Sequence, residues 1–141
     1  MTNPRVVTFT DGMFSDDATF SIDNSTITYS ATATGGSAQV GLAVHLSAAK
    51  TVQLAADGEE VTGKLIKVSA DNVATVQVKG VMTLPAGTGA SLTLGKKIVG
   101  AVLVAAEGYI REVATGTAAE LGVCRGFIVD AGTTTAVVVW L

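Results

Sequence analysis

Short runs of β-branched residues, separated by clusters of Gly, Asp and Asn, are the feature that most limits how this chain can fold. Runs of this kind are typical of β-strands joined by tight turns, and Leu stripes at helical spacing are missing. The chain ends on GFIVDAGTTTAVVVWL, two apolar strands around an Asp-Ala-Gly-Thr turn. The pattern predicts an all-β fold, a small β-sandwich or barrel-like domain with short helical turns only.

The clearest hairpin is predicted at residues 63–78, GKLIKVSADNVATVQV. Asp71 and Asn72 separate its two runs, and both residue types tolerate turn backbone angles. In the second run Val76 and Val78 are expected to face one way, with Gln77 and Lys79 facing the other way.

Two further elements are predicted from local patterns. TITYSATA at 26–33 alternates apolar and polar residues, which favours a half-buried strand. TAAEL at 117–121 favours a short helix, with Thr117 as its cap and Glu120 completing a capping box.

Composition excludes several classes of protein. The 141 residues fit one domain, carry a net charge of −3, and contain no strongly basic run, so nucleic acid is not an expected partner. No apolar run is long enough to cross a bilayer, no secretory signal is expected, and no membrane partner is expected. Charged residues make up 15% of the chain, against about 25% in an average protein. A surface this poor in charge favours a component of an oligomer or assembly.

The first quarter of the chain differs from the rest in composition. Residues 1–36 are richer in Thr, Ser and Asp and are predicted to form an N-terminal arm or edge extension, followed by a β-rich domain at 37–141. Aromatic and Met side chains in a polar arm suit contact anchors. An ordinary first sheet with an aromatic core is the equal alternative. The candidates for contact are Phe9, Met13, Phe14 and Phe20.

Candidate chemistry is sparse. His45 is the only histidine and Cys124 the only cysteine, and each lies in an apolar strand-like run. A lone His does not make a usual metal site, and a lone Cys makes no internal disulfide. We therefore expect no catalytic residues, no cofactor, no metal and no enzyme activity.

Trp140, the only Trp, lies next to the last residue of the terminal strand. It either closes the core of its own chain together with Leu141, or it anchors the strand at a subunit boundary. We expect the terminal strand to complete a sheet. The candidates for the subunit boundary are Val137, Val139, Trp140 and Leu141.

From about Val40 onward, four segments together resemble the tailed-phage capsid decoration proteins, also called capsid cement proteins. The segments are VGLAVHLSAAKTVQLAADGEEVTGKLIKV, ATVQVKGVMTLPAG, GKKIVGAVLVAAEGYIREV and AAELGVCRGFIVDAGTTTAVVVWL. Each segment alone is ordinary strand-and-turn sequence, and the likeness lies in their order and spacing over the last two thirds of the chain.

The resemblance implies a structural virion protein and no chemistry. A homotrimer would sit on the outer surface of the phage head and cement adjacent major capsid proteins. Its expected partners are the major capsid protein and further copies of itself. The alternative from another class is a carbohydrate- or receptor-binding β module of a phage fibre or tail. A small hydrolase is the weakest hypothesis because no dense polar constellation is present.

Overall fold

The computed structural model describes residues 12–88, 90, 92–114, 117–133 and 136–141, with side chains described except at 132–138 and 140. Over these residues the chain is mostly β, which confirms the predicted fold class. The strands are β1 (Asp16–Ile22), β2 (Ala43–Ala48), β3 (Thr51–Leu54), β4 (Gly63–Val68), β5 (Val73–Lys79), β6 (Val81–Leu84), β7 (Ile98–Leu103), β8 (Ala106–Glu112), β9 (Phe127–Thr133) and β10 (Ala136–Trp140). The helical elements are the turn η1 (Thr34–Gly36) and the short helix α1 (Ala118–Val123).

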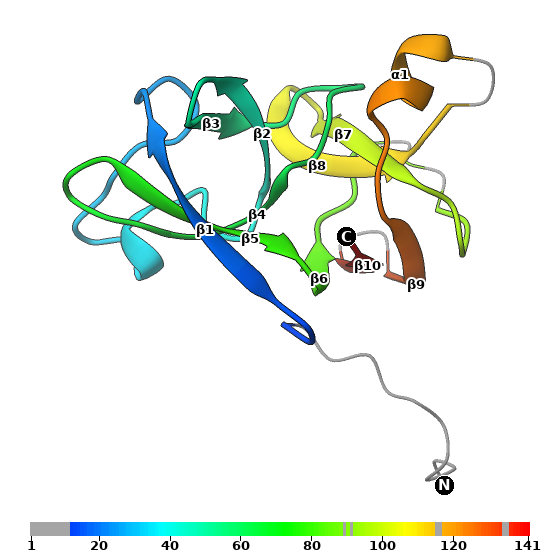
Figure 1. Cartoon of the computed structure of the whole chain (residues 1–141), viewed down its shortest axis with the longest axis horizontal. Helices are drawn as coiled ribbons and strands as arrows, with labels where there is room; N and C mark the ends of the chain where they lie inside the picture. The colour runs from blue at the N-terminus through cyan, green and yellow to red at the C-terminus, as the bar shows by residue number, and fades with distance from the viewer. Residues whose placement is uncertain (1–11, 89, 91, 115–116, 134–135) are drawn as a thin grey trace, which may run out of the picture.

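A closed barrel forms one half of the molecule (Figure 1). Its strands follow the order β1-β3-β2-β4-β5, and β1 closes it by pairing antiparallel with β5 and parallel with β3. Apolar side chains fill its interior, among them Ile22, Val44, Val52, Leu65 and Val76. Closure leaves the five strands without open edges along their paired residues.

The other half is built from a three-stranded sheet in the order β6-β10-β9 and the β7–β8 hairpin. A second core lies between them and includes Met82, Leu84, Ile98, Ile110 and Ile128. The terminal strand β10 is the middle strand of its sheet, so the apolar C-terminal run completes a sheet, as predicted.

Arg125, in the segment between α1 and β9, ties the second half to the barrel. Its guanidinium donates hydrogen bonds to the carbonyls of Val61, Thr62 and Val78 at 3.3, 3.0 and 3.1 Å. Hydrogen bonds from a charged donor contribute more to the stability of the fold than hydrogen bonds between neutral groups do. The two halves are therefore joined by polar contacts as well as by chain connections.

The hairpin predicted at 63–78 is confirmed as β4 and β5, and Asn72 in its turn has the positive φ of 61°. Val76 packs inside the barrel, and Gln77, one residue on, projects to the other face. That face is covered too, because Gln77 is only 4% exposed. Its amide donates to the carbonyls of Val81 and Lys79, where β5 passes into β6.

The strand predicted at 26–33 is wrong, since all eight residues are described and none is in a strand. Ile27 is buried in the barrel core, but Tyr29 is exposed. Thr26 attaches the segment through its side chain, whose hydroxyl oxygen accepts a hydrogen bond from the Leu54 backbone N–H at 2.8 Å. The Thr26 hydroxyl therefore accepts the hydrogen bond that a backbone carbonyl of a neighbouring strand would otherwise accept from Leu54.

Candidate interaction surfaces

The two ends of the described chain meet at one place, which we call the terminal junction: Gly12–Phe14, Gly80 and Leu141. Gly12 N–H donates to the Val81 carbonyl at 2.7 Å, and Val81 N–H donates to the Met13 carbonyl at 2.8 Å. Gly80 and Leu141 exchange two backbone hydrogen bonds, at 3.1 and 3.3 Å. The structure thus brings Met13 and Phe14, predicted contact residues, together with Leu141, predicted at a subunit boundary.

Gly80 makes this close approach feasible. Its φ is +99°, a conformation that residues with a Cβ rarely adopt. A Cβ built on it would lie 2.6 Å from the carbonyl oxygens of both Met13 and Phe14. Phe14 itself has a positive φ of 57° and an exposed side chain. An exposed aromatic residue in a sparsely populated conformation marks the junction as a candidate contact surface.

The other predicted contact and boundary residues are dispersed. Phe20 on β1 is half-buried and packs against the barrel core. Val139 is fully buried in the second core and so packs within its own chain. The backbones of Val137 and Trp140 pair with β6, and their side chains lie outside the described part. Phe9 also lies outside the described residues.

The segment predicted as an arm or extension is, over its described part, integrated into the barrel. β1 supplies one of the barrel strands, and Ile22 and Ile27 contribute to the barrel core. The described part of this segment therefore contains a barrel strand, and its Phe14 is exposed instead of filling an aromatic core.

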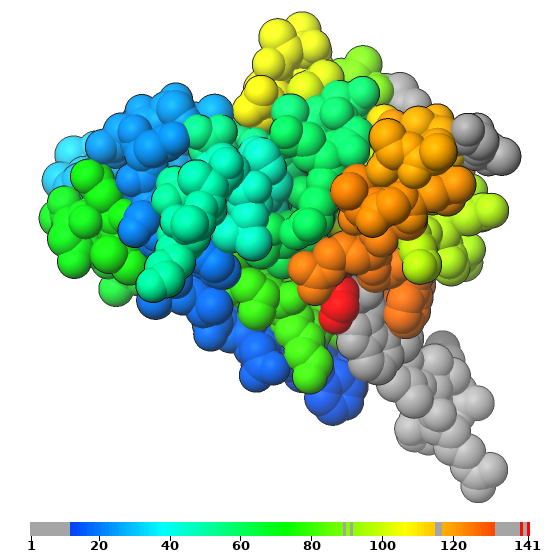
Figure 2. All heavy atoms as spheres, turned by 45° about the horizontal axis from the view of Figure 1, so that its top comes forward, coloured from blue at the N-terminus to red at the C-terminus, as the bar shows by residue number. Residues whose placement is uncertain are grey.

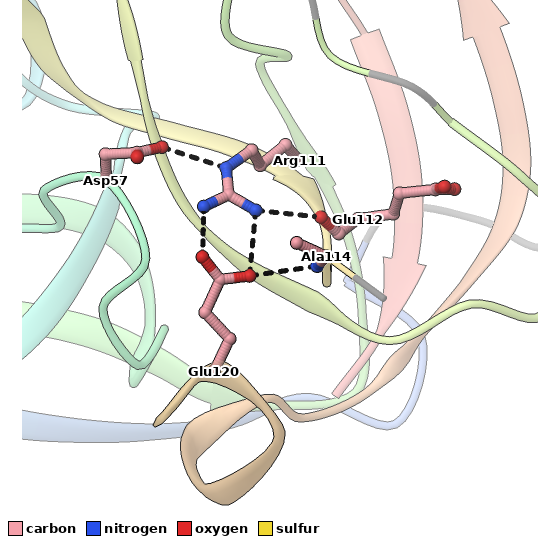
Figure 3. Close-up of polar contacts among 5 residues, drawn as sticks. All are labelled: Asp57, Arg111, Glu112, Ala114 and Glu120. Atoms are coloured by element: carbon pink, nitrogen blue, oxygen red, sulfur yellow. Dashed lines mark hydrogen bonds and ion pairs between the residues drawn. The ribbon is translucent and has the colours of Figure 1, made fainter. Parts of the chain in front are cut away.

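A polar cluster holds α1 in place (Figure 3). Arg111 on β8 donates from Nη1 to Glu120 Oε2 at 3.0 Å and from Nη2 to Glu120 Oε1. Its Nε donates to Asp57 Oδ1 at 2.8 Å, and the Ala114 backbone N–H donates to Glu120 Oε2 at 2.9 Å. All six residues of α1 are described and none is buried, so this cluster replaces apolar packing as the attachment of the helix.

The Arg111 guanidinium, with help from the Ala114 N–H, lowers the pKa of Glu120 to about 2. The two acidic partners in turn raise the pKa of Arg111. Both members of the pair are charged at neutral pH. The predicted capping box is wrong, because Thr117 makes no side-chain cap bond among the described residues and Glu120 turns to Arg111 instead.

Three exposed apolar side chains lie along α1 and the start of β9: Leu121, Val123 and Phe127. We call this set the α1–β9 stripe. In Figure 2, α1 and the segment leading to β9 (orange) run as one continuous strip over the visible face. Leu121 is 57% exposed. The sequence-based prediction missed these residues, because apolar residues on a helix ordinarily face the core and so gave no signal of exposure.

The two candidate reactive residues have ordinary surroundings. His45 Nε2 lies 3.1 Å from Glu59 Oε2, which also accepts the Ala56 backbone N–H. Cys124 is half-buried and donates from Sγ to the Leu121 carbonyl. Within the described part of the chain, no group of three or more His, Cys, Asp or Glu is placed to hold a metal ion. No helix among the described residues has the length and apolar character needed to cross a membrane.

Comparison with known proteins returns no match: no family model, no curated protein and no solved structure is significantly similar to this chain. The likeness to capsid decoration proteins therefore stays a prediction from the order of its sequence segments.

Proposed function

We propose that this protein is a structural component of a tailed-phage virion that binds the outer surface of the head as a homotrimer and cements adjacent major capsid proteins. The observation that carries the proposal is the α1–β9 stripe, three exposed apolar side chains of which two are on a helix fixed by an ion pair instead of by burial and one is at the start of β9. Large exposed apolar patches mark binding surfaces in soluble proteins. The low charge content and the order of the sequence segments support the same function.

In this function the protein would stabilise the head by burying apolar surface against the capsid proteins. The stripe and the exposed Phe14 of the terminal junction supply apolar contacts, each buried methylene contributing about 0.8 kcal/mol. The Arg111–Glu120 pair holds α1 before binding, which lowers the ordering cost on contact. A trimer that engages several capsid subunits at once gains further from multivalency.

The test is binding to phage heads assembled without this protein, followed by sedimentation. The wild-type chain should co-sediment with heads and raise the temperature at which they lose their DNA. Leu121→Asp should weaken co-sedimentation at least tenfold, because it places a charge in the stripe. Leu46→Asp is the matched control, since Leu46 on β2 is similarly exposed, at 48%, and belongs to the barrel.

Two results contradict the proposal. One is a wild-type protein that never binds heads, and the other is equal binding by both Asp variants and the wild type. A fluorescence change of Trp140 on titration with sugars would favour the glycan-binding module instead.

A further inference from the structure

The turn of the β7–β8 hairpin, Leu103–Ala106, carries only apolar residues, and all four are exposed. We call it the hairpin tip. Figure 2 shows this hairpin (yellow) projecting at the top of the molecule. Val104 is 88% exposed and has a φ of +61°. A β-branched residue is a conformational outlier there, because two-residue hairpin turns favour Asn, Asp and Gly. Val104 is thus unusual in two ways: a large apolar side chain is exposed, and a β-branched residue occupies a turn position with a positive φ.

Hydrogen bonds with Thr88 hold the hairpin tip in this conformation. Val104 N–H donates to Thr88 Oγ1 at 2.8 Å, and Thr88 N–H donates to the Val102 carbonyl at 2.9 Å. The supporting segment passes very close to the hairpin, since a Cβ on Gly87 would lie 2.7 Å from the Val102 carbonyl oxygen. The tip is therefore presented as a preorganised apolar projection, which reduces the entropy lost on binding.

A groove elsewhere on the chain is lined by apolar residues and one lysine, and so could accept an apolar projection that carries an acidic residue. It has a volume of about 500 Å³ and lies between the barrel and the end of β6. Its apolar lining includes the partly buried Val40, Leu42 and Pro85, and Lys64 contributes a positive charge. Glu107 directly follows the hairpin tip, so the projection carries an acidic residue at its base and the groove a basic one.

We propose that the hairpin tip of one copy of this chain seats in this groove of the next copy, with Val104 in the apolar part and Glu107 near Lys64. Such a contact joins two different surfaces, and head-to-tail contacts of that kind close into rings when the rotation between copies permits it. The inference rests on the proposed homotrimer and names the surfaces that form it. A lipid surface fits less well, because membrane-inserting segments are flanked by basic and aromatic residues and here the flanking residue is acidic.

The experiment measures solution mass by light scattering over a range of protein concentrations. The wild-type chain should have the mass of three chains, and Val104→Asn should raise the dissociation constant of the trimer at least tenfold. Asn tolerates a positive φ, so at concentrations low enough for both chains to be monomeric the variant should unfold at a higher temperature than the wild type. Val104→Ile keeps an apolar β-branched side chain and should keep the trimer. A purely structural role for Val104 would change thermal stability and leave the mass unaltered.

A charge exchange tests the groove. Glu107→Lys and Lys64→Glu should each weaken the trimer, and the double variant should recover a large part of it. A wild-type chain that stays monomeric at all concentrations overturns the inference, as does a Val104→Asn variant that stays trimeric. If that trimeric variant no longer binds heads, the tip faces the capsid protein and only the self-contact is refuted. If the wild-type chain trimerises through the tip but never binds heads, the inference stands and the proposed function fails.

Discussion

Replacing Glu120 by Gln should weaken the attachment of α1 while leaving the rest of the fold intact. The helix has no buried residue, so its attachment depends on the two hydrogen bonds between Arg111 and the Glu120 carboxylate and on the bond from Ala114 N–H. An amide retains one acceptor oxygen and loses the charge. The effect should therefore be local opening of α1 instead of global unfolding.

The size of the effect follows from the acidity of Glu120. Its pKa falls from 4.5 to about 2. At about 1.4 kcal/mol per pKa unit, this corresponds to an upper limit of about 3 kcal/mol. Solvent reaches the pair, because the Arg111 side chain is 21% exposed, and screening lowers the contribution to about 1–2 kcal/mol. Local opening of α1 should then become about 5–30 times more frequent.

The assay is amide hydrogen exchange of two N–H groups that donate hydrogen bonds along α1, one within the helix and one at its C-cap. Leu121 N–H donates to the Thr117 carbonyl at 3.0 Å, and Cys124 N–H donates to the Glu120 carbonyl at 2.8 Å. Both should exchange about 5–30 times faster in Glu120→Gln at pH 7. Glu60→Gln is the matched control, because an amide oxygen can still accept the hydrogen bond that Glu60 receives from Thr62.

The pH dependence gives a second, independent check. The pKa of Glu120 is lower in the folded chain than in the unfolded chain, so its contribution is present above about pH 4.5 and is lost as pH falls towards 2. The ratio of exchange rates between variant and wild type should therefore approach one over that interval. Equal rates at pH 7, or a ratio that does not change between pH 5 and pH 2.5, would refute the ion-pair attachment of α1.

Three further changes have defined outcomes, each measured against the wild type. Gly80→Ala should cost about 3 kcal/mol or more in urea unfolding, whereas Gly41→Ala, with a similar φ of +96° and nothing within 4 Å of its Cβ, should cost about 1–2 kcal/mol. Arg125→Met should cost about 2–4 kcal/mol by the same measurement, because three carbonyls lose their donor. Asp57→Asn should speed α1 exchange less than threefold, since that carboxylate is 59% exposed.

Much of the local structure was predictable because the signals lie close together in the chain. The hairpin predicted at 63–78 has both strands and its turn close together in the chain, and Asn72 adopts the turn conformation expected of it. The terminal hairpin was predicted only in part, because β9 and β10 do pair, but the predicted turn residues at 130–133 lie inside β9. In the first hairpin the residues that specify the turn also fix which strands can pair, whereas in the second the apolar runs alone indicated the pairing.

Closure of the barrel was beyond local reasoning. β1 pairs with β5 across more than fifty residues and runs parallel to β3, and neither contact leaves a pattern in the sequence of β1. The burial of Gln77 was also unpredictable from local sequence. Alternation places its side chain on the other face of β5 from Val76, and only the tertiary fold covers that face as well. Residues 26–33 alternate like a strand, yet Thr26 contacts the barrel through its hydroxyl instead.

The candidate surfaces were predictable only in part. Glu120 was singled out as a helix-capping residue, and Arg111 lies nine residues before it, so a contact between them was within reach of sequence reasoning. The contact between Arg111 and Asp57, which lies fifty-four residues before it, could not be predicted from the sequence. The exposure of Leu121 follows from that pairing, because a helix held by its polar side need not bury its apolar residues.

The separation of the apolar surfaces has a functional consequence. The hairpin tip belongs to the β7–β8 hairpin, whereas the α1–β9 stripe lies on α1 and at the start of β9 (Figures 1 and 2). If the tip joins copies and the stripe contacts the head, a trimer holds three stripes in fixed relation, and losing the tip should leave each stripe intact. Linked sites exceed the affinity of a single site by about 10²–10⁴-fold. Val104→Asn should therefore lower head binding through lost multivalency, and Leu121→Asp should lower it while the solution mass stays at three chains.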